Sequence, residues 1–273
     1  MTANLLVSIS HATRYTLTAP AHYSIQSLRL TPPTFDGQKV VSWDIDMPHI
    51  ENAVTFRDCF GNMAHLVAIP EPHSAITITA RGIVETQDRA GSVRGLLETT
   101  PVRVFKRETS MTAPDEAIRA LAASVKGKGT LELIHALMTE VHDGVEYIVG
   151  VTDAHTSAAE ALREGRGVCQ DHAHIFISAA RVMGVPARYV NGYFVTGGEE
   201  PAEAHHAWAE VWIDGLGWLG FDPANGLCPT ERYIRLACGL DSGSAAPIRG
   251  NRRGGLEEVL DVVVEVQQQS AQQ

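Results

Sequence analysis

The stretch GRGVCQDHAHIFISAARVMGVP, residues 165–186, decides the fold. Its apolar core predicts a helix from Cys169 to Met183, and Gly184 together with Pro186 brings that helix to an end. The glycines that precede the cysteine permit a sharp turn into the helix. A cysteine therefore stands at the first position of an apolar helix.

The position of Cys169 favours a reactive thiol. A helix N-terminus carries the positive end of the helix dipole, which favours the thiolate, and the thiolate is the nucleophilic form of cysteine. Free N–H groups of the first turn can also donate to a developing oxyanion. The alternative is a small buried apolar side chain, and this ordinary role is what we expect for Cys59, Cys228 and Cys238.

Helices precede strands in the second part of the chain. Sequence patterns predict helices over residues 114–125, 130–141 and 156–163, ahead of the cysteine helix. Four strands follow that helix, with the sequences VPARYVNGYFV, HHAWAEVWI, GWLGFD and LEEVLDVVVEV. This order is typical of an α+β domain.

The first part of the chain has the composition of strands. Six segments, from RYTLT to SAITITARGIVE, alternate or are rich in strand-forming residues, and turn signals such as Asp36-Gly37 separate them. Short strands punctuated in this way predict a small sandwich or barrel. We therefore expect a β-sandwich-like N-terminal domain over residues 1–100, a catalytic α+β domain over 101–267, and a disordered tail over 268–273.

The strand HHAWAEVWI has two different faces. One face carries only small or apolar residues, which suits packing on a core. The other mixes polar groups with tryptophans and suits the wall of a cleft: it carries His206, Trp208, Glu210 and Trp212.

Asp222 ends the next strand, and the register of the two strands decides whether it can reach His206. A two-residue loop at Asp214-Gly215 would set His206 opposite Pro223. A three-residue loop from Ile213 to Gly215, with a left-handed glycine, sets His206 opposite Asp222, and we predict this register. A carboxylate on one ring nitrogen would leave the other for the thiol. The alternative is that His206 is a core histidine and Asp222 caps a turn, and for Asp222 taken alone the turn role is favoured, because Asp before Pro is common in turns.

The overall composition narrows the class of protein. The chain of 273 residues is 44% hydrophobic and 20% charged, which is typical of a soluble globular protein. Its net charge of −10 argues against nucleic acid or an anionic membrane as a partner. Neither a signal peptide nor a run of ~20 apolar residues is visible, so we expect a cytoplasmic location. Four scattered cysteines without a CxxC pair predict no disulfide scaffold and no structural metal, and no motif predicts a cofactor.

Four motifs, GRGVCQDHAH, VPARYVNGYF, HHAWAEVWI and GWLGFDPANG, resemble in order and spacing the bacterial transglutaminase-like cysteine-enzyme family. The resemblance implies a papain-like core, in which the cysteine helix packs on an antiparallel sheet. It also implies a catalytic triad of Cys169, His206 and Asp222. The segments SLRLTPP, DCFGN and AIPEPHSAITITA are similar to the β-rich region that precedes this core in one bacterial subgroup.

Three further residues are candidates for the site. Gln170 follows the nucleophile and would lend its backbone N–H to the oxyanion. Tyr147 stands where family members often have an aromatic residue that lines the active site, and core packing is an equal alternative. Trp208 could line a substrate groove, although large aromatic side chains more often belong to a core.

His172 departs from the family pattern, which often has an aromatic residue at this position. It lies one turn after Cys169, on the same helix face, and could tune the thiol. We favour a place at the domain interface, because His206 already fills the role of the base. A zinc site would need Cys169, His172 and His206 to converge, and we regard it as the weaker alternative.

The sequence predicts covalent acyl transfer at an amide carbonyl of a peptide or protein substrate. Cys169 would attack the carbonyl, His206 would protonate the leaving amine, and a thioester would form. Water as the acceptor gives a protease or amidase, and an amine gives a cross-linking transglutaminase. We favour hydrolysis, because no second substrate site is evident. A non-catalytic binding module on the same core is the alternative from another class, and the sequence predicts no oligomeric state.

Overall fold

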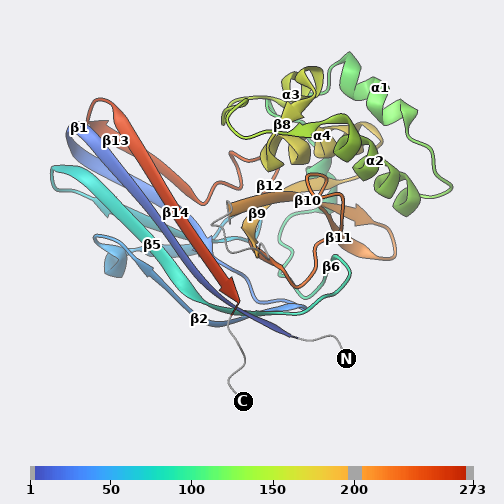
Figure 1. Cartoon of the computed structure of the whole chain (residues 1–273). Coiled ribbons are helices and arrows are strands. Elements are labelled where there is room, and N and C mark those ends of the chain that lie inside the picture. Colours follow the sequence, from blue (N-terminus) through green and yellow to red (C-terminus); the bar gives the residue numbers. More distant parts are fainter. Residues whose placement is uncertain (1–3, 196–204, 269–273) are drawn as a thin grey trace.

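The computed structural model describes residues 4–195 and 205–268, which form a mixed α+β structure with a β-rich part and a helical part (Figure 1). The β-rich N-terminal region and the mixed fold class agree with the prediction. The described strands of the β-rich part form one seven-stranded antiparallel sheet. They are β1 (Leu5–Thr31), β2 (Gln38–Asp46), β3 (Val54–Arg57), β4 (Met63–Ile69), β5 (His73–Thr86), β13 (Ile248–Gly254) and β14 (Glu258–Gln268).

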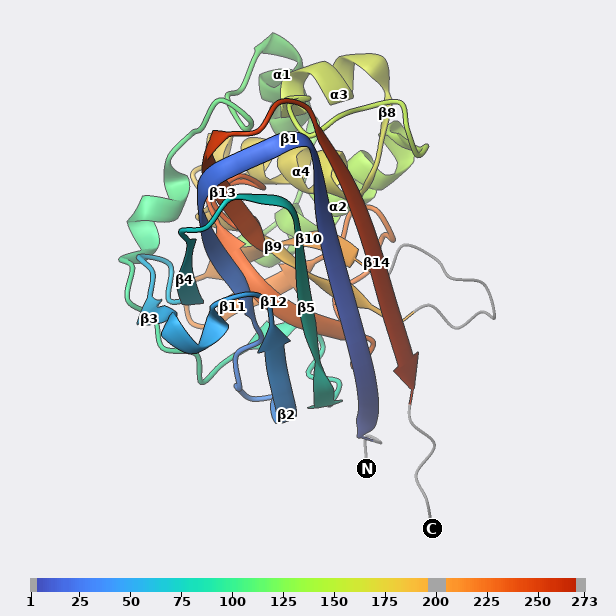
Figure 2. The same ribbon diagram turned by 90° about the vertical axis from the view of Figure 1, so that its left-hand side faces the viewer.

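β1 is the central strand of this sheet. Its first half lies between β5 and β14, and its second half lies between β4 and β13. Buried side chains fall on odd positions from Val7 to Ala21 and on even positions from Ser24 to Leu30. The register shift between Ala21 and Tyr23 accounts for this change, because an extra residue displaces the two-residue period. The strand thereby keeps one face toward the interior as it turns a corner (Figure 2).

β13 and β14 belong to this sheet although they come last in the chain. β14 pairs with β1 from Val7 opposite Gln268 to Leu17 opposite Glu258. The expected division at residue 100 assigned both strands to the catalytic domain over 101–267, whereas their hydrogen bonds place them in the N-terminal sheet. Alternation in a sequence gives the faces of a strand but not its distant partner. Of the tail expected over 268–273, Gln268 ends β14, and residues 269–273 lie outside the described residues.

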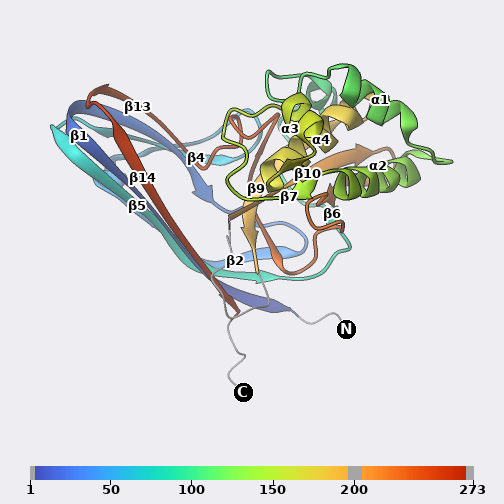
Figure 3. The same ribbon diagram turned by 45° about the horizontal axis from the view of Figure 1, so that its top comes forward.

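The described residues form a second, five-stranded sheet with helices over it (Figure 3). Its strands, in spatial order, are β12 (Tyr233–Gly239), β9 (Ala187–Phe194), β10 (His205–Ile213), β11 (Gly217–Phe221) and β6 (Ser92–Val93). The helices are α1 (Glu116–Ser124), α2 (Thr130–Gly144), α3 (Ala158–Glu164) and α4 (Cys169–Val182). Shorter elements are η1 (Ile50–Asn52), η2 (Val102–Lys106) and the parallel pair β7 (Glu146–Tyr147) and β8 (Arg166–Gly167). None of the described helices is long and apolar enough to span a bilayer.

α4 is the centre of the helical part. Its residues from Asp171 to Arg181 are all buried, and α1, α2 and α3 pack against it. The apolar face of β10 packs in the same core through Ala207, Ala209, Val211 and Ile213. Two predictions are thereby confirmed: the helix begins at Cys169, and the uniformly apolar face of HHAWAEVWI faces the core. The core that holds the nucleophile helix is thus built from both the helices and the second sheet.

The two sheets share a second hydrophobic core. The inner face of the N-terminal sheet packs against side chains from β9, β12 and the residue after β9, namely Tyr193, Val195, Ile234 and Leu236. Two amide side chains also cross between the sheets: Gln38 bonds the backbone of Arg235, and Asn62 bonds the backbone of Cys238. The N-terminal sheet is therefore part of the support of the second sheet.

Candidate active site

Cys169 is held at a fixed place by the tight turn into α4. Gly165 has a left-handed φ of 65°, which favours glycine. At Gly167 the chain has no room for a side chain, because a Cβ would lie 2.6 Å from Oδ2 of Asp171. That same oxygen accepts a hydrogen bond from the backbone N–H of Val168 at 2.8 Å. The half-buried thiol therefore sits at the start of a helix whose first turn is closed by a carboxylate.

His206 and Asp222 form the predicted hydrogen bond in a register that differs from the prediction. Nε2 of His206 lies 2.6 Å from Oδ2 of Asp222. The strands pair Ile213 with Gly217, so the loop is Asp214–Leu216, and the register is two residues away from the expected one. Gly215 is left-handed as expected, with a φ of 83°. A shift of two residues leaves every side chain on its own face, so Asp222 still reaches His206 diagonally.

The carboxylate of Asp222 is fully buried and accepts several hydrogen bonds. Its Oδ2 accepts from His206, from the Tyr233 hydroxyl at 2.6 Å and from Asn225 Nδ2 at 2.7 Å. Its Oδ1 accepts from the backbone N–H of Ala224 at 3.0 Å. Burial alone would raise the pKa of Asp222, but the hydrogen bond and charge of His206 outweigh burial and lower it. Asp222 is therefore both a turn-closing residue and a fixed anion.

Sequence reasoning missed two of these partners. Asn225 stands within the quoted motif GWLGFDPANG, where its position three residues after Asp222 could have suggested a side chain that folds back onto the turn. Tyr233 is the first residue of β12, and no motif marks it. Burial and the Asp222 carboxylate raise the pKa of Tyr233 far above its usual range, so its hydroxyl remains a donor.

The electrostatics of His206 favour its charged form. Burial lowers the pKa of this ring, but hydrogen bonds to Asp222 and to Cys169 outweigh burial and raise the pKa to about 10. Because Nε2 is engaged by Asp222, Nδ1 is the nitrogen left for the thiol. The structure thus brings Cys169, His206 and Asp222 together in the order thiol, imidazole and carboxylate. Such a pair can exist as thiolate and imidazolium.

The other candidates occupy different positions. Trp208 is buried beside the His206 ring, with the ring centroids 6.3 Å apart, and its indole lies over Gly192, where a Cβ would meet it at 2.7 Å. It supports His206 from within the protein and borders a small pocket. Tyr147 is 44% exposed on β7, beside the turn that leads to the cysteine helix. Gln170 is half-buried at the second position of α4.

We expected His172 at the interface with the N-terminal sheet, but it lies elsewhere. It is buried between the start of α4 and the end of α2. Its Nδ1 lies 2.9 Å from the carbonyl oxygen of Val168, and its Nε2 lies 3.0 Å from that of Val145. The sequence predicted which face of the helix carries His172, but it did not predict that the end of α2 covers this face. The expectation failed for that reason.

Glu210 borders a small pocket, and two arginines hold its carboxylate. Its carboxylate is fully buried between two arginines: it accepts from Nε of Arg188 at 2.6 Å and from Nε of Arg235 at 2.9 Å. Arg188 in turn stacks on Trp218, with its guanidinium carbon 4.0 Å from the ring centroid. After His206 and Trp208, the mixed face of β10 therefore carries a buried ion cluster at Glu210.

Two further histidines close in sequence to the triad, His174 and His205, bond to groups other than the thiol. His174 accepts a hydrogen bond from the backbone N–H of Ser242, and His205 bonds the side chain of Asn191. Burial lowers the pKa of each of these rings to about 4, so both are neutral near pH 7. Within residues 4–195 and 205–268, no three His, Cys, Asp or Glu side chains are placed to hold a metal ion.

Two family models match this sequence. The model of the transglutaminase-like superfamily matches residues 119–223, and that of the bacterial transglutaminase-like N-terminal region matches residues 7–85. An uncharacterized protein of Mycobacterium leprae is 30% identical over 94% of this chain and 97% of its own length. The chain belongs to the transglutaminase-like superfamily.

A solved structure agrees with the fold of this transglutaminase-like protein. The crystal structure of a "Putative Cysteine Protease" from Cytophaga hutchinsonii has a TM-score of 0.76 and covers 100% of this chain and 94% of its own. The two sequences are 21% identical, so this likeness shows the fold alone.

A protein-glutamine gamma-glutamyltransferase of Pseudomonas aeruginosa is 35% identical over 109 residues, which are 35% of this chain and 16% of that protein.

Proposed function

We propose that this transglutaminase-like protein is a cysteine-nucleophile enzyme that hydrolyses an amide bond of a peptide or protein. The observation that carries the proposal is the arrangement of a half-buried thiol, a buried imidazole and a fully buried carboxylate, with the carboxylate 2.6 Å from the ring. A nucleophile beside a base that a third group orients is the arrangement that covalent acyl transfer needs.

The chemistry divides into two steps. The Cys169 thiolate attacks the carbonyl carbon, a C–S bond forms and the C–N bond breaks, while the His206 imidazolium gives its proton to the leaving amine. Backbone N–H groups of the first turn of α4, including that of Gln170, are candidate donors to the oxyanion. In the second step water attacks the thioester and gives one proton to His206, the C–S bond breaks, and the Cys169 thiolate and a carboxylic acid are released.

Transfer to an amine is the alternative reaction. The partial likeness to a protein-glutamine gamma-glutamyltransferase supports it, because the same thioester forms in both cases. A protein described as a "Putative Cysteine Protease" has the same fold, which agrees with hydrolysis. The two reactions differ only in which nucleophile reaches the thioester, so a single experiment can separate them.

The experiment incubates the full chain with peptides from a cell lysate and a biotin-tagged primary amine in water enriched in oxygen-18. Mass spectrometry then counts new carboxyl termini or glutamates that carry the heavy oxygen, and peptides that carry the tag. Hydrolysis predicts heavy oxygen without the tag, and transfer predicts the tag. Whichever signal the wild type gives should vanish in Cys169→Ala. It should persist in Cys228→Ala, which removes another half-buried thiol.

A non-catalytic binding module would give neither signal, and thiol labelling tests this directly. Burial raises the pKa of the Cys59 and Cys228 thiols, and the sulfur of buried Cys238 bonds the carbonyl of Phe60. Iodoacetamide near pH 6 should therefore modify Cys169 well before the other three. Equal labelling of all four cysteines contradicts the proposed role of Cys169.

A further inference from the structure

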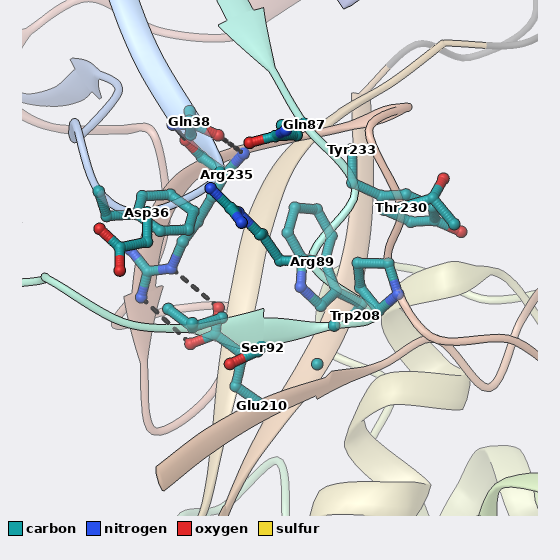
Figure 4. A pocket seen from close by; sticks show the side chains of 16 residues that line it. Asp36, Gln38, Gln87, Arg89, Ser92, Trp208, Glu210, Thr230, Tyr233 and Arg235 are labelled. Atoms are coloured by element: carbon teal, nitrogen blue, oxygen red, sulfur yellow. Dashed lines mark hydrogen bonds and ion pairs between the residues drawn. The ribbon is translucent and has the colours of Figure 1, made fainter. Parts of the chain in front are cut away.

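β12 connects the N-terminal sheet to the candidate triad. It is the edge strand of the five-stranded sheet, and β9 is the only described strand that pairs with it. Its first residue, Tyr233, donates its hydroxyl to Asp222 at 2.6 Å. Two residues later, Arg235 is bonded by a side chain of the N-terminal sheet, and its own side chain bonds Glu210. Figure 4 shows Gln38, Arg235, Tyr233 and Glu210 around one pocket.

The amide of Gln38 takes the place of a neighbouring strand at Arg235. Its Oε1 accepts from the backbone N–H of Arg235 at 2.7 Å, and its Nε2 donates to the Arg235 carbonyl at 2.9 Å. Nε2 also donates to the carbonyl of Pro33 at 2.8 Å, which ties the amide to its own region. Gln38 is buried, with 2% of its surface exposed. An amide that is buried and bonded at both atoms fixes the backbone that it contacts.

Tyr233 packs against the rings of Phe194 and Trp208 on one side and borders a cavity on another. A cavity of about 50 Å³ lies beside it, lined by Gln38, Arg235, Trp208 and Tyr233 among others (Figure 4). A side chain next to a void lacks contacts on that side, so its position depends more strongly on its backbone and its hydrogen bonds. The backbone of β12 near Tyr233 is the part that Gln38 fixes.

We propose that Tyr233 is a positioning residue for the triad and that the N-terminal sheet acts through it. Gln38 fixes β12 at Arg235, β12 fixes Tyr233, and the Tyr233 hydroxyl fixes Asp222 beside His206. The proposal rests on the proposed function, because it concerns the same triad. It assigns the N-terminal sheet a part in catalysis although this sheet contributes no residue of the triad.

The test measures the rate of Cys169 alkylation by iodoacetamide from pH 4 to pH 9 in the full chain. The variants are Tyr233→Phe, which removes only the hydroxyl, and Gln38→Leu, which removes the amide. If Asp222 moves away from His206, the positive charge of the imidazolium is less stable. The imidazolium then supports the Cys169 thiolate less well, so the thiolate should form only at higher pH. We expect the acid limb of the profile to move up by about half a pH unit or more in both variants. The titratable groups near Asp222 are His206 on β10, Tyr233 on β12 and, at the carbonyl of Pro223, His142 on α2.

Two matched variants separate positioning from a general loss of stability. Tyr193→Phe removes another buried tyrosine hydroxyl, which bonds His11 and not the triad. Asn62→Leu removes an amide that bonds the backbone of β12 in the same two-atom way, but at Cys238, farther from Tyr233. Both should leave the profile within about 0.2 pH units of the wild type.

The outcomes are distinct. A Tyr233→Phe profile that coincides with the wild type overturns the proposal, and this variant carries the test if Gln38→Leu does not fold. Equal shifts in Asn62→Leu and Gln38→Leu also overturn it, because they would mean a general loosening of β12. A wild-type Cys169 that reacts no faster than Cys228 contradicts the proposed function itself, and the wild type alone shows this.

Discussion

Nε2 of His206 lies 2.6 Å from Oδ2 of Asp222, yet these two residues do not stand opposite each other in the pairing of β10 and β11. Asp222 follows the last residue of β11 and lies in the turn, where its Oδ1 accepts from the N–H of Ala224. One carboxylate therefore closes a turn with one oxygen and orients the histidine with the other. Substitution of Asp222 should consequently affect both stability and activity.

His206→Ala should reduce kcat/KM more than Asp222→Ala does. The histidine moves the proton and the aspartate only orients it, so we expect losses of about 10³-fold and about 10²-fold respectively. Asn225→Ala, which removes one donor to Asp222, is the milder comparison. The measurement is steady-state kinetics on a peptide found in the lysate experiment. If Asp222→Ala matched the wild type, another group would have to orient His206.

The contribution of His206 to stability should depend on pH. Its pKa in the folded protein is about 10, above the ordinary value of 6.5, so the charged form is stabilised by folding. This stabilisation is complete below pH 6.5 and is lost as the pH rises through 10. The free energy of unfolding of the wild type minus that of His206→Gln should therefore fall between these limits, by up to ~1 kcal/mol per pH unit.

His205→Gln is the control for this pH dependence. His205 lies next to His206 on the same strand, but burial lowers its pKa to about 4, so it is neutral throughout this range. In the unfolded chain His205 titrates near its ordinary value of 6.5, so the corresponding difference for His205 should rise slightly from pH 6 and be constant from about pH 8 to pH 10. Urea titrations at three pH values give both differences. A constant difference for His206 would show that its charge is not stabilised by folding.

Glu210→Gln should be strongly destabilising. Burial would raise the pKa of Glu210, but the charges of Arg188 and Arg235 outweigh burial and lower it, so the carboxylate is charged. Loss of this charge leaves two buried guanidinium groups without their shared partner and should cost about 3–5 kcal/mol. Glu98→Gln removes the partly exposed partner of Arg188 and should cost about 1 kcal/mol or less. Chemical unfolding measures both, and equal costs would contradict this account.

A chain that begins at Val102 should fail to fold. It would expose Tyr193, Val195, Ile234 and Leu236, which pack against the N-terminal sheet, and would leave β13 and β14 without β1. We expect aggregation on size-exclusion chromatography, and partial recovery when residues 1–101 are co-expressed. A soluble, folded monomer would show that the second sheet is stable alone.

The local elements were predictable because their signals are local. The start of α4 follows from glycines before an apolar helical run, and the face shared by His206 and Asp222 follows from alternation. The exact register was not predictable, because a left-handed Gly215 fits more than one loop. The observed loop begins one residue later than the predicted one. The face was nevertheless right, because an error of two residues preserves it.

The partners that come from distant strands were not predictable in this way. Tyr233 and Gln38 reach the site through contacts between elements, and neither residue type signals its partner. The same holds for Glu210, whose alternation with His206 and Trp208 suggested a cleft. Only the arrangement of β9 beside β10, with β12 on the other side of β9, brings Arg188 and Arg235 to it.

The pairing of Val7 with Gln268 has a consequence for synthesis of the chain on the ribosome. When the first hundred residues have emerged, β1 can pair with β4 and β5, but the flanks that β13 and β14 later cover remain open. Open strand edges invite pairing with other chains, and contacts this remote in sequence form slowly. Until β13 and β14 have been synthesised, the N-terminal sheet is therefore prone to pair with other chains.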